Sequence, residues 1–155
     1  MNVTPKITLL LVSASAMFPA RAGLNNDELN LLLDPGGWQY VTVSDQDAGV
    51  QTQHVCFDGK AHPDQCSGTL SFHPDKTFIK QINIHGQNVD RHGTYQIDDN
   101  EVSFYDEFGN RDGPYTLDLN PQTKMLVLSM PQLRMELELE RQYKDDLQKR
   151  KAPQH

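Results

Sequence analysis

The chain has 155 residues, of which 14 are basic and 21 acidic, so its formal net charge is −7. This length suits one domain. An acidic surface repels phosphate backbones and anionic lipid head groups, so we expect no nucleic acid or membrane surface as a partner. The charge favours cationic proteins or ligands instead.

The first 22 residues have the composition of a cleavable secretion signal. Residues 1–6 carry one positive side chain, residues 7–18 are apolar or small, and residues 20–22 read Ala-Arg-Ala, as a signal peptidase requires. The apolar run is well short of the roughly 20 residues that span a bilayer. Cleavage would remove Lys6 and Arg21, leave 12 basic against 21 acidic residues, and give a net charge of about −9. We therefore expect a periplasmic or secreted protein.

Two cysteines, Cys56 and Cys66, follow the predicted signal. In an oxidising compartment such a pair predicts a disulfide, which would stabilise the fold by about 3 kcal/mol. The alternative is a metal site in which His54 and His62 join the two thiols. Its ligand spacing fits no common zinc pattern, so we expect no metal there.

Residues 24–34 predict a short helix. Asn25 stands three positions before Glu28, which forms a capping box. The leucines Leu29, Leu32 and Leu33 fall on one side and predict packing against a core. The helix should end at residues 34–37, Asp-Pro-Gly-Gly, because proline disfavours helix before it and glycine frees the backbone.

From residue 38 to residue 141 the pattern has period two, with turn signals every eight to twelve residues. Strands are expected near residues 38–44, 50–57, 68–73, 77–85, 93–97, 102–105, 115–120, 124–130 and 132–142. In the last strand one face carries Leu133, Met135, Leu137, Leu139 and Arg141. The pattern predicts an all-β fold, a single antiparallel meander closed or nearly closed into a barrel of eight or nine strands. A polar helix or tail should follow at residues 143–155.

A Gly-x-Trp motif, Gly36-Gly37-Trp38, opens the first strand directly after the short helix, and Arg141 lies on the apolar face of the last strand. This pair resembles the lipocalin and wider calycin pattern. In that pattern an N-terminal helix closes one barrel end, and an indole face holds a guanidinium by a cation-π contact. The resemblance implies that residues 23–142 form a lipocalin-like barrel closed by Trp38 and Arg141.

The opening of the domain is also similar to a group of bacterial periplasmic β proteins whose function is not established. The shared residues are Pro35-Gly36-x-Trp38, Thr42-Val43, Gln53 and Cys56. The likeness fades after Cys66. It supports the compartment and implies no activity.

The barrel interior can be a ligand cavity or an ordinary core. Its candidate lining residues are Tyr40, Phe72, Phe78, Ile82, Ile84, Tyr95, Phe104, Tyr115, Leu117, Leu137 and Leu139. Narrow barrels of about eight strands can be filled by their own side chains, so we expect a filled or nearly filled interior. The expected function is then non-catalytic binding of another envelope or secreted protein, as an inhibitor or accessory subunit. Phe57, Tyr105 and Phe108 would form its exposed patch. The alternative is a carrier of a small apolar ligand inside the barrel.

The histidines His54, His62, His73, His85 and His92 are interpreted as solvated strand or turn positions rather than metal ligands. His85 and His92 flank one expected hairpin loop and should lie together. The group Asp106-Glu107, Asn110, Asp112 and Gly113 lacks the regular spacing and closing glutamate of a calcium loop, so we expect an acidic turn. No metal and no cofactor are predicted.

Motifs of catalysis are missing from the linear sequence. It has no Gly-x-Ser-x-Gly elbow, no His-Glu-x-x-His and no phosphate-binding glycine loop, and a disulfide leaves no free thiol. We therefore predict no catalytic residue. A small hydrolase or isomerase that uses a pair of carboxylates is the second alternative.

Overall fold

The computed structural model describes residues 23–142, and the predicted signal and C-terminal tail lie outside this range. The elements are α1 (Asn26–Leu33), β1 (Trp38–Asp47), β2 (Val50–Val55), β3 (Cys66–Phe72), β4 (Thr77–Ile84), β5 (Gln87–Asp98), β6 (Glu101–Asp106), β7 (Arg111–Asn120), β8 (Met125–Met130), the 3₁₀ turn η1 (Pro131–Leu133) and β9 (Met135–Arg141). The expected all-β fold with one short N-terminal helix is confirmed.

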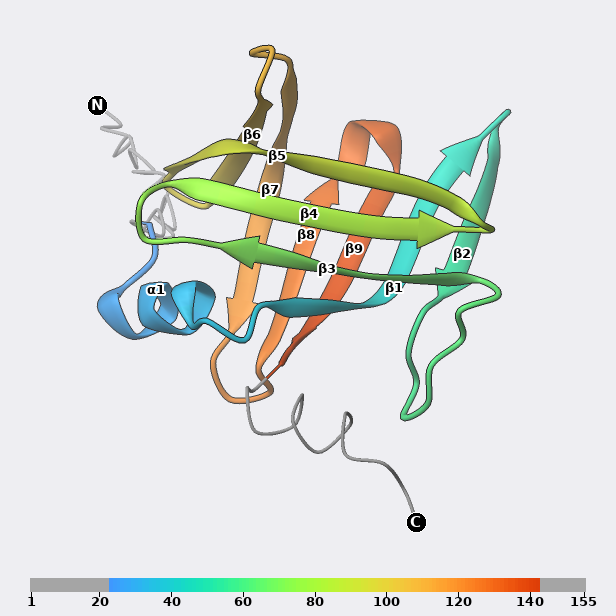
Figure 1. The fold of residues 1–155 in the computed structure, drawn as a ribbon, viewed down its shortest axis with the longest axis horizontal. Coiled ribbons are helices and arrows are strands. Elements are labelled where there is room, and N and C mark those ends of the chain that lie inside the picture. Colours follow the sequence, from blue (N-terminus) through green and yellow to red (C-terminus); the bar gives the residue numbers. More distant parts are fainter. Residues whose placement is uncertain (1–22, 143–155) are drawn as a thin grey trace, which may run out of the picture.

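The strands form a closed antiparallel barrel. From β3 to β9 each strand pairs with the next, and β1 closes the ring by pairing with both β9 and β3. These eight strands make the barrel, and β2 pairs with β1 as an additional strand. In Figure 1, β3, β4 and β5 cross over β7, β8 and β9 at a steep angle.

β1 changes its neighbour along one edge. Its first residues, Trp38 and Gln39, pair with β3, whereas the segment from Thr42 to Asp47 pairs with β2. An extra residue, Val41, lies between the two parts, and its carbonyl accepts hydrogen bonds from the backbone N–H groups of Cys56 and Phe57, at N···O distances of 2.8 and 3.2 Å. The barrel wall is therefore continuous at the start of β1 and parted further along it.

The predicted disulfide is confirmed, and it lies beside this change of neighbour. Cys56, just after β2, is bonded to Cys66 at the start of β3, with a sulfur–sulfur distance of 2.04 Å. The bond thus ties together the two strands that share one edge of β1.

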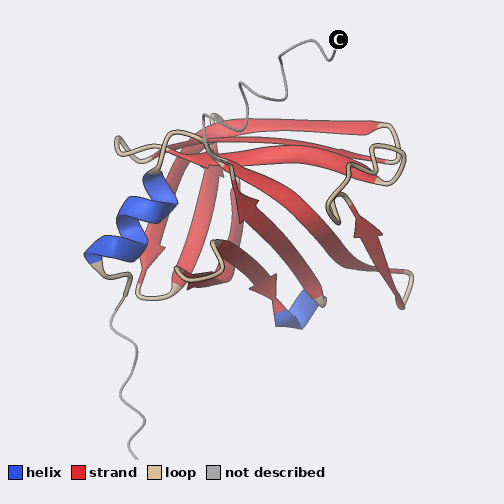
Figure 2. Ribbon diagram, turned by 90° about the horizontal axis from the view of Figure 1, so that it is seen from below, coloured by secondary structure: helices blue, strands red, loops and turns tan. Residues whose placement is uncertain are grey.

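Helix α1 begins with the predicted capping box. The Glu28 N–H donates to Asn25 Oδ1 (2.9 Å), and the Asn25 N–H donates to Glu28 Oε2 (3.0 Å). Figure 2 shows α1 lying against one end of the barrel. There the Trp38 indole N–H donates to the Leu32 carbonyl at 3.1 Å, and Leu32 is fully buried in the core.

Arg141 meets Trp38 at this same end. Its guanidinium carbon lies 5.5 Å from the centre of the indole ring. The guanidinium also donates to the Gly37 carbonyl and forms an ion pair with Asp34, while the arginine side chain itself is fully buried. The pair that carries the calycin resemblance therefore packs where α1 covers the barrel.

Two local expectations are wrong. Leu133 does not share the inward face of the last strand, because η1 and a left-handed Arg134 precede β9 and leave Leu133 53% exposed. His85 and His92 do not lie together, because β5 begins at Gln87 and makes the preceding turn short. His85 instead packs edge-to-face on His54, with ring centres 4.7 Å apart, and His92 pairs with Glu107.

Removal of the disulfide should lower stability without changing the topology. In the double variant Cys56→Ser/Cys66→Ser the loop between β2 and β3 is no longer closed, which should cost about 3 kcal/mol of unfolding free energy. Urea denaturation followed by the fluorescence of Trp38 measures this. Wild-type protein treated with reductant should match the variant. An unchanged urea midpoint would show that the disulfide between β2 and β3 does not stabilise the fold.

Candidate functional site: the open end of the barrel

The two ends of the barrel are built differently. The α1 end is filled by fully buried side chains, among them Trp38, Tyr40, Leu126 and Leu139. The other end, where the β4–β5, β6–β7 and β8–β9 turns lie, holds a cavity of about 530 Å³ that opens to solvent. The expectation of a filled interior therefore applies to one end only.

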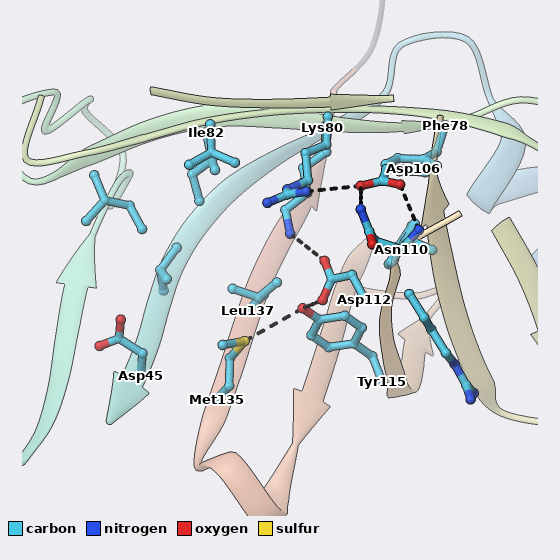
Figure 3. Close-up of a pocket in the computed structure, with 16 residues that line it drawn as sticks. Asp45, Phe78, Lys80, Ile82, Asp106, Asn110, Asp112, Tyr115, Met135 and Leu137 are labelled. Carbon is cyan, nitrogen blue, oxygen red and sulfur yellow. Dashed lines mark hydrogen bonds and ion pairs between the residues drawn. The ribbon is translucent and has the colours of Figure 1, made fainter. Parts of the chain in front are cut away.

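Apolar and polar side chains divide the cavity wall (Figure 3). The apolar members are Val43, Phe78, Ile82, Ile84, Val89, Phe104, Tyr115, Met135 and Leu137. The polar members are Asp45, Lys80, Arg91, Asp106, Asn110, Arg111 and Asp112. Six of the predicted lining residues belong to this wall: Phe78, Ile82, Ile84, Phe104, Tyr115 and Leu137.

The remaining predicted lining residues belong to the filled end. Tyr40, Phe72, Tyr95, Leu117 and Leu139 are buried in the core. Phe72 packs edge-to-face on Tyr95, with ring centres 5.2 Å apart, and the Tyr95 hydroxyl donates to the His73 carbonyl at 2.8 Å. These side chains lie between the cavity and the α1 end of the barrel, and they do not line the cavity.

Two β-bulges turn acidic side chains into the cavity. On β1 the extra residue Val41 shifts the alternation, so that Val43 and Asp45 continue the inward face of Trp38 and Tyr40. On β7 the register shifts between Tyr115 and Asp112, and both line the cavity although they are three positions apart.

The bulge on β7 depends on Gly113. Its φ of 128° is a conformation that side chains with a Cβ rarely adopt, and an added Cβ would lie 2.9 Å from the Val102 carbonyl oxygen. The glycine that had entered the calcium-loop interpretation therefore serves to place Asp112.

A polar network crosses the cavity from β4 to β7. The Lys80 ammonium lies 3.2 Å from Asp112 Oδ2, and the Tyr115 hydroxyl donates to Asp112 Oδ1 at 2.6 Å. The hydroxyl also lies 3.7 Å from the Met135 sulfur. Burial raises the pKa of Tyr115, and its hydrogen bond to Asp112 raises this pKa further. The network holds a charge pair against an otherwise apolar wall.

A second group lies at the β6–β7 turn. Asp106 accepts hydrogen bonds from the backbone N–H groups of Phe108 and Asn110 and from the Asn110 side-chain amide, and it pairs with Arg91 at 3.5 Å. The amide hydrogen bond from Asn110 is the first cause of the lowered pKa of Asp106. The segment is thus an acidic turn closed by its own hydrogen bonds. Among residues 23–142, no group of three or more His, Cys, Asp or Glu side chains is placed to hold a metal ion.

The Tyr40 hydroxyl is buried below the cavity and has no hydrogen-bond partner among the described residues. Burial raises its pKa, and the negative charge of Asp112 raises it further. An unsatisfied buried hydroxyl costs folding free energy, in contrast to the bonded hydroxyl of Tyr115.

The three residues predicted to form an exposed patch do not lie together in the structure. Phe57 lies in the loop between β2 and β3, where it bridges to Ala61, and Phe108 lies at the β6–β7 turn, far from that loop in Figure 1. Phe108 is 82% exposed, whereas Phe57 and Tyr105 are half-buried. Of the three, Phe108 alone is strongly exposed.

The polar wall was missed by sequence reasoning. Lys80 carried a usable signal, because it stands in alternation with Phe78 and Ile82 on one face of β4. Asp45 and Asp112 carried none, since strict alternation from Trp38 and from Tyr115 directs both outward, and only the bulges reverse them.

The two tyrosines should respond oppositely to removal of the hydroxyl. Tyr115→Phe deprives Asp112 of a partner and should destabilise the fold by about 1.5 kcal/mol. Tyr40→Phe removes an unsatisfied group and should leave stability unchanged or raise it.

The raised pKa values of Tyr40 and Tyr115 also predict that stability falls as pH rises above about 10, because only the unfolded state then ionises. Urea denaturation at neutral and alkaline pH tests this.

The pH dependence supplies the control. Each Phe variant should lose less stability than wild type between neutral and alkaline pH, because one tyrosine no longer ionises on unfolding. Equal losses in all three proteins would contradict the burial assigned to the two hydroxyls.

Comparisons with protein family models, with curated proteins and with solved structures found no match to this chain. None of the helices in the described part is long and apolar enough to cross a membrane. The strand pairing shows a closed antiparallel barrel of eight strands with one additional strand, which is consistent with a calycin-like barrel.

Proposed function

We propose that this protein binds a small, largely apolar ligand in the open end of its barrel. The observation that carries the proposal is the cavity of about 530 Å³, which lies within the usual range of roughly 300–1,000 Å³ for small-molecule sites. Such sites combine apolar walls with a few placed polar groups. The cavity has both.

The cavity is held open by the covalent and hydrogen-bonded frame around it. β1 is fixed by the disulfide-linked strands on one edge and by β9 on the other. The Phe104 ring packs between two other aromatic rings of the cavity wall. Its centre lies 4.8 Å from the ring centre of Phe78 and 5.9 Å from that of Tyr115. A preformed site of this kind needs little ordering when a ligand binds.

We also propose that the protein works outside the cytoplasm as a lipocalin-like binding protein. The disulfide favours an oxidising compartment. The contact between Trp38 and Arg141 beneath α1 supports the lipocalin likeness. The sequence left two functions open, binding of another protein and carriage of a small apolar ligand. The open cavity favours the carriage of a ligand.

Two substitutions on opposite faces of β4 test ligand binding. Ile82 points into the cavity, and Ile79 points to the outside of the same strand. Ile82→Trp should fill the cavity and weaken binding of the neutral dye Nile red by about tenfold or more, which corresponds to about 1.4 kcal/mol. Ile79→Trp should leave binding unchanged. Dye fluorescence titration measures both.

The paired variants separate cavity binding from adsorption on the surface. Both proteins must first show a wild-type circular dichroism spectrum. If wild type fails to bind the dye, or if the two tryptophan variants weaken binding equally, the cavity is not a ligand site.

Binding of another protein remains a second candidate, supported by the 82% exposure of Phe108 beside the open end. Replacement Phe108→Ser should then abolish retention of a partner when mature protein is purified from the envelope. Ile79→Ser, on an outward face elsewhere, is the control. If neither wild type nor the variants retain a protein, this candidate is refuted.

A further inference from the structure

The cavity wall holds charged side chains of both signs. Its wall contains three carboxylates, those of Asp45, Asp106 and Asp112. Three basic side chains also line it, those of Lys80, Arg91 and Arg111. Which of these charges remains available to a ligand depends on the partners that each has within the protein.

Two of the carboxylates are neutralised locally. Asp112 pairs with Lys80 at 3.2 Å and also accepts from Tyr115. Asp106 pairs with Arg91 at 3.5 Å and is enclosed by the hydrogen bonds of its own turn. Neither ion pair leaves a net charge in the cavity.

The guanidinium of Arg111 is engaged on the outer side of the barrel. Its Nε and Nη2 donate to the Ser103 hydroxyl at 3.2 and 2.9 Å. Ser103 alternates on β6 with the inward-facing Val102 and Phe104, and with Arg111 it lines a small separate pocket on the outer side of the barrel. The Arg111 guanidinium is therefore held by a neutral hydroxyl and not by a carboxylate of the cavity.

Asp45 is left without a partner. No hydrogen bond or ion pair joins its half-buried carboxylate to any residue in the range 23–142. Figure 3 shows it on β1, across the apolar stretch around Leu137 from the Lys80–Asp112 pair. Among the described residues, Asp45 is thus the one cavity carboxylate that no basic side chain pairs with, and it lies at the end of an apolar wall.

We propose that the ligand is an organic cation with an apolar body, whose positive group pairs with Asp45 while its body covers Ile82 and Leu137. This inference rests on the proposed function of the cavity. The net charge of −7 acts in the same direction, since the field of an acidic protein attracts cations and repels anions. An anionic head group would meet Asp45 and would have to compete with Asp112 for Lys80.

Three ligands with one alkyl chain and different head groups test the inference. Decylammonium, decanol and decanoate are each titrated against Nile red bound to the folded protein, below the concentrations at which they form micelles. Decylammonium should displace the dye at a concentration about five- to tenfold lower than decanol, with decanoate weakest, as expected for one ion pair in a half-buried site.

Asp45→Asn should abolish the preference for the ammonium group, and it should not weaken displacement of the dye by decanol. Asp64→Asn is the matched control, because it removes the same charge from an exposed loop outside the cavity. It should keep the preference for the cation.

The outcomes separate this inference from the proposed function. If Nile red binds and decanol or decanoate displaces it as well as decylammonium does, the cation preference is refuted and the cavity remains. A preference that persists in Asp45→Asn, or disappears in Asp64→Asn, also refutes the role of Asp45. If Nile red does not bind at all, both proposals fall together.

Discussion

β1 is bonded to two different strands along one edge, and the bulge at Val41 marks the point of change. At the α1 end the ring of backbone hydrogen bonds closes through Trp38 and Gln39 on β3. Beyond the bulge that edge of β1 belongs to β2, so β3 no longer bonds to it. Because the wall is closed by strand pairing at one end and parted at the other, a single chain of modest size has both a filled core and a cavity.

The charged groups inside the barrel fall into two classes for the same reason. Arg141 is explained by closure, because it joins the Gly37 carbonyl, the Asp34 carboxylate and the Trp38 ring at the covered end. Lys80 and Asp112 do not take part in this closure of the covered end. A partly buried ion pair contributes little net stability, since desolvation offsets its Coulomb attraction. The Lys80–Asp112 pair lies in the part of the wall that the proposed ligand would cover.

Simple alternation predicted the fold because most of the chain obeys it. The capping box at Asn25, the disulfide and the inward face of β9 from Met135 onward all depend on local patterns that the structure keeps. The site could not be predicted in the same way. A bulge adds one residue and reverses the faces of everything beyond it. Nothing at Val41 marks the first bulge in the sequence. Gly113 and the following proline, a pair typical of bulges, stand before residue 115, where the expected strand began, so they were not taken as part of a strand.

The cavity wall combines apolar side chains with a paired charge and an unpaired one, and these would contribute differently to the affinity and the selectivity of the proposed site. A ligand body that covers the Lys80–Asp112 pair removes water from it and strengthens the attraction between the two charges, because the local dielectric falls. The pair therefore tolerates an apolar cover without needing a bond from the ligand. Asp45 cannot be covered in that way, since an unpaired carboxylate loses its hydration and gains nothing in return. In the proposed ligand site, the apolar wall would supply affinity for many molecules, and the carboxylate of Asp45 would select among them by penalising those that bring no cation.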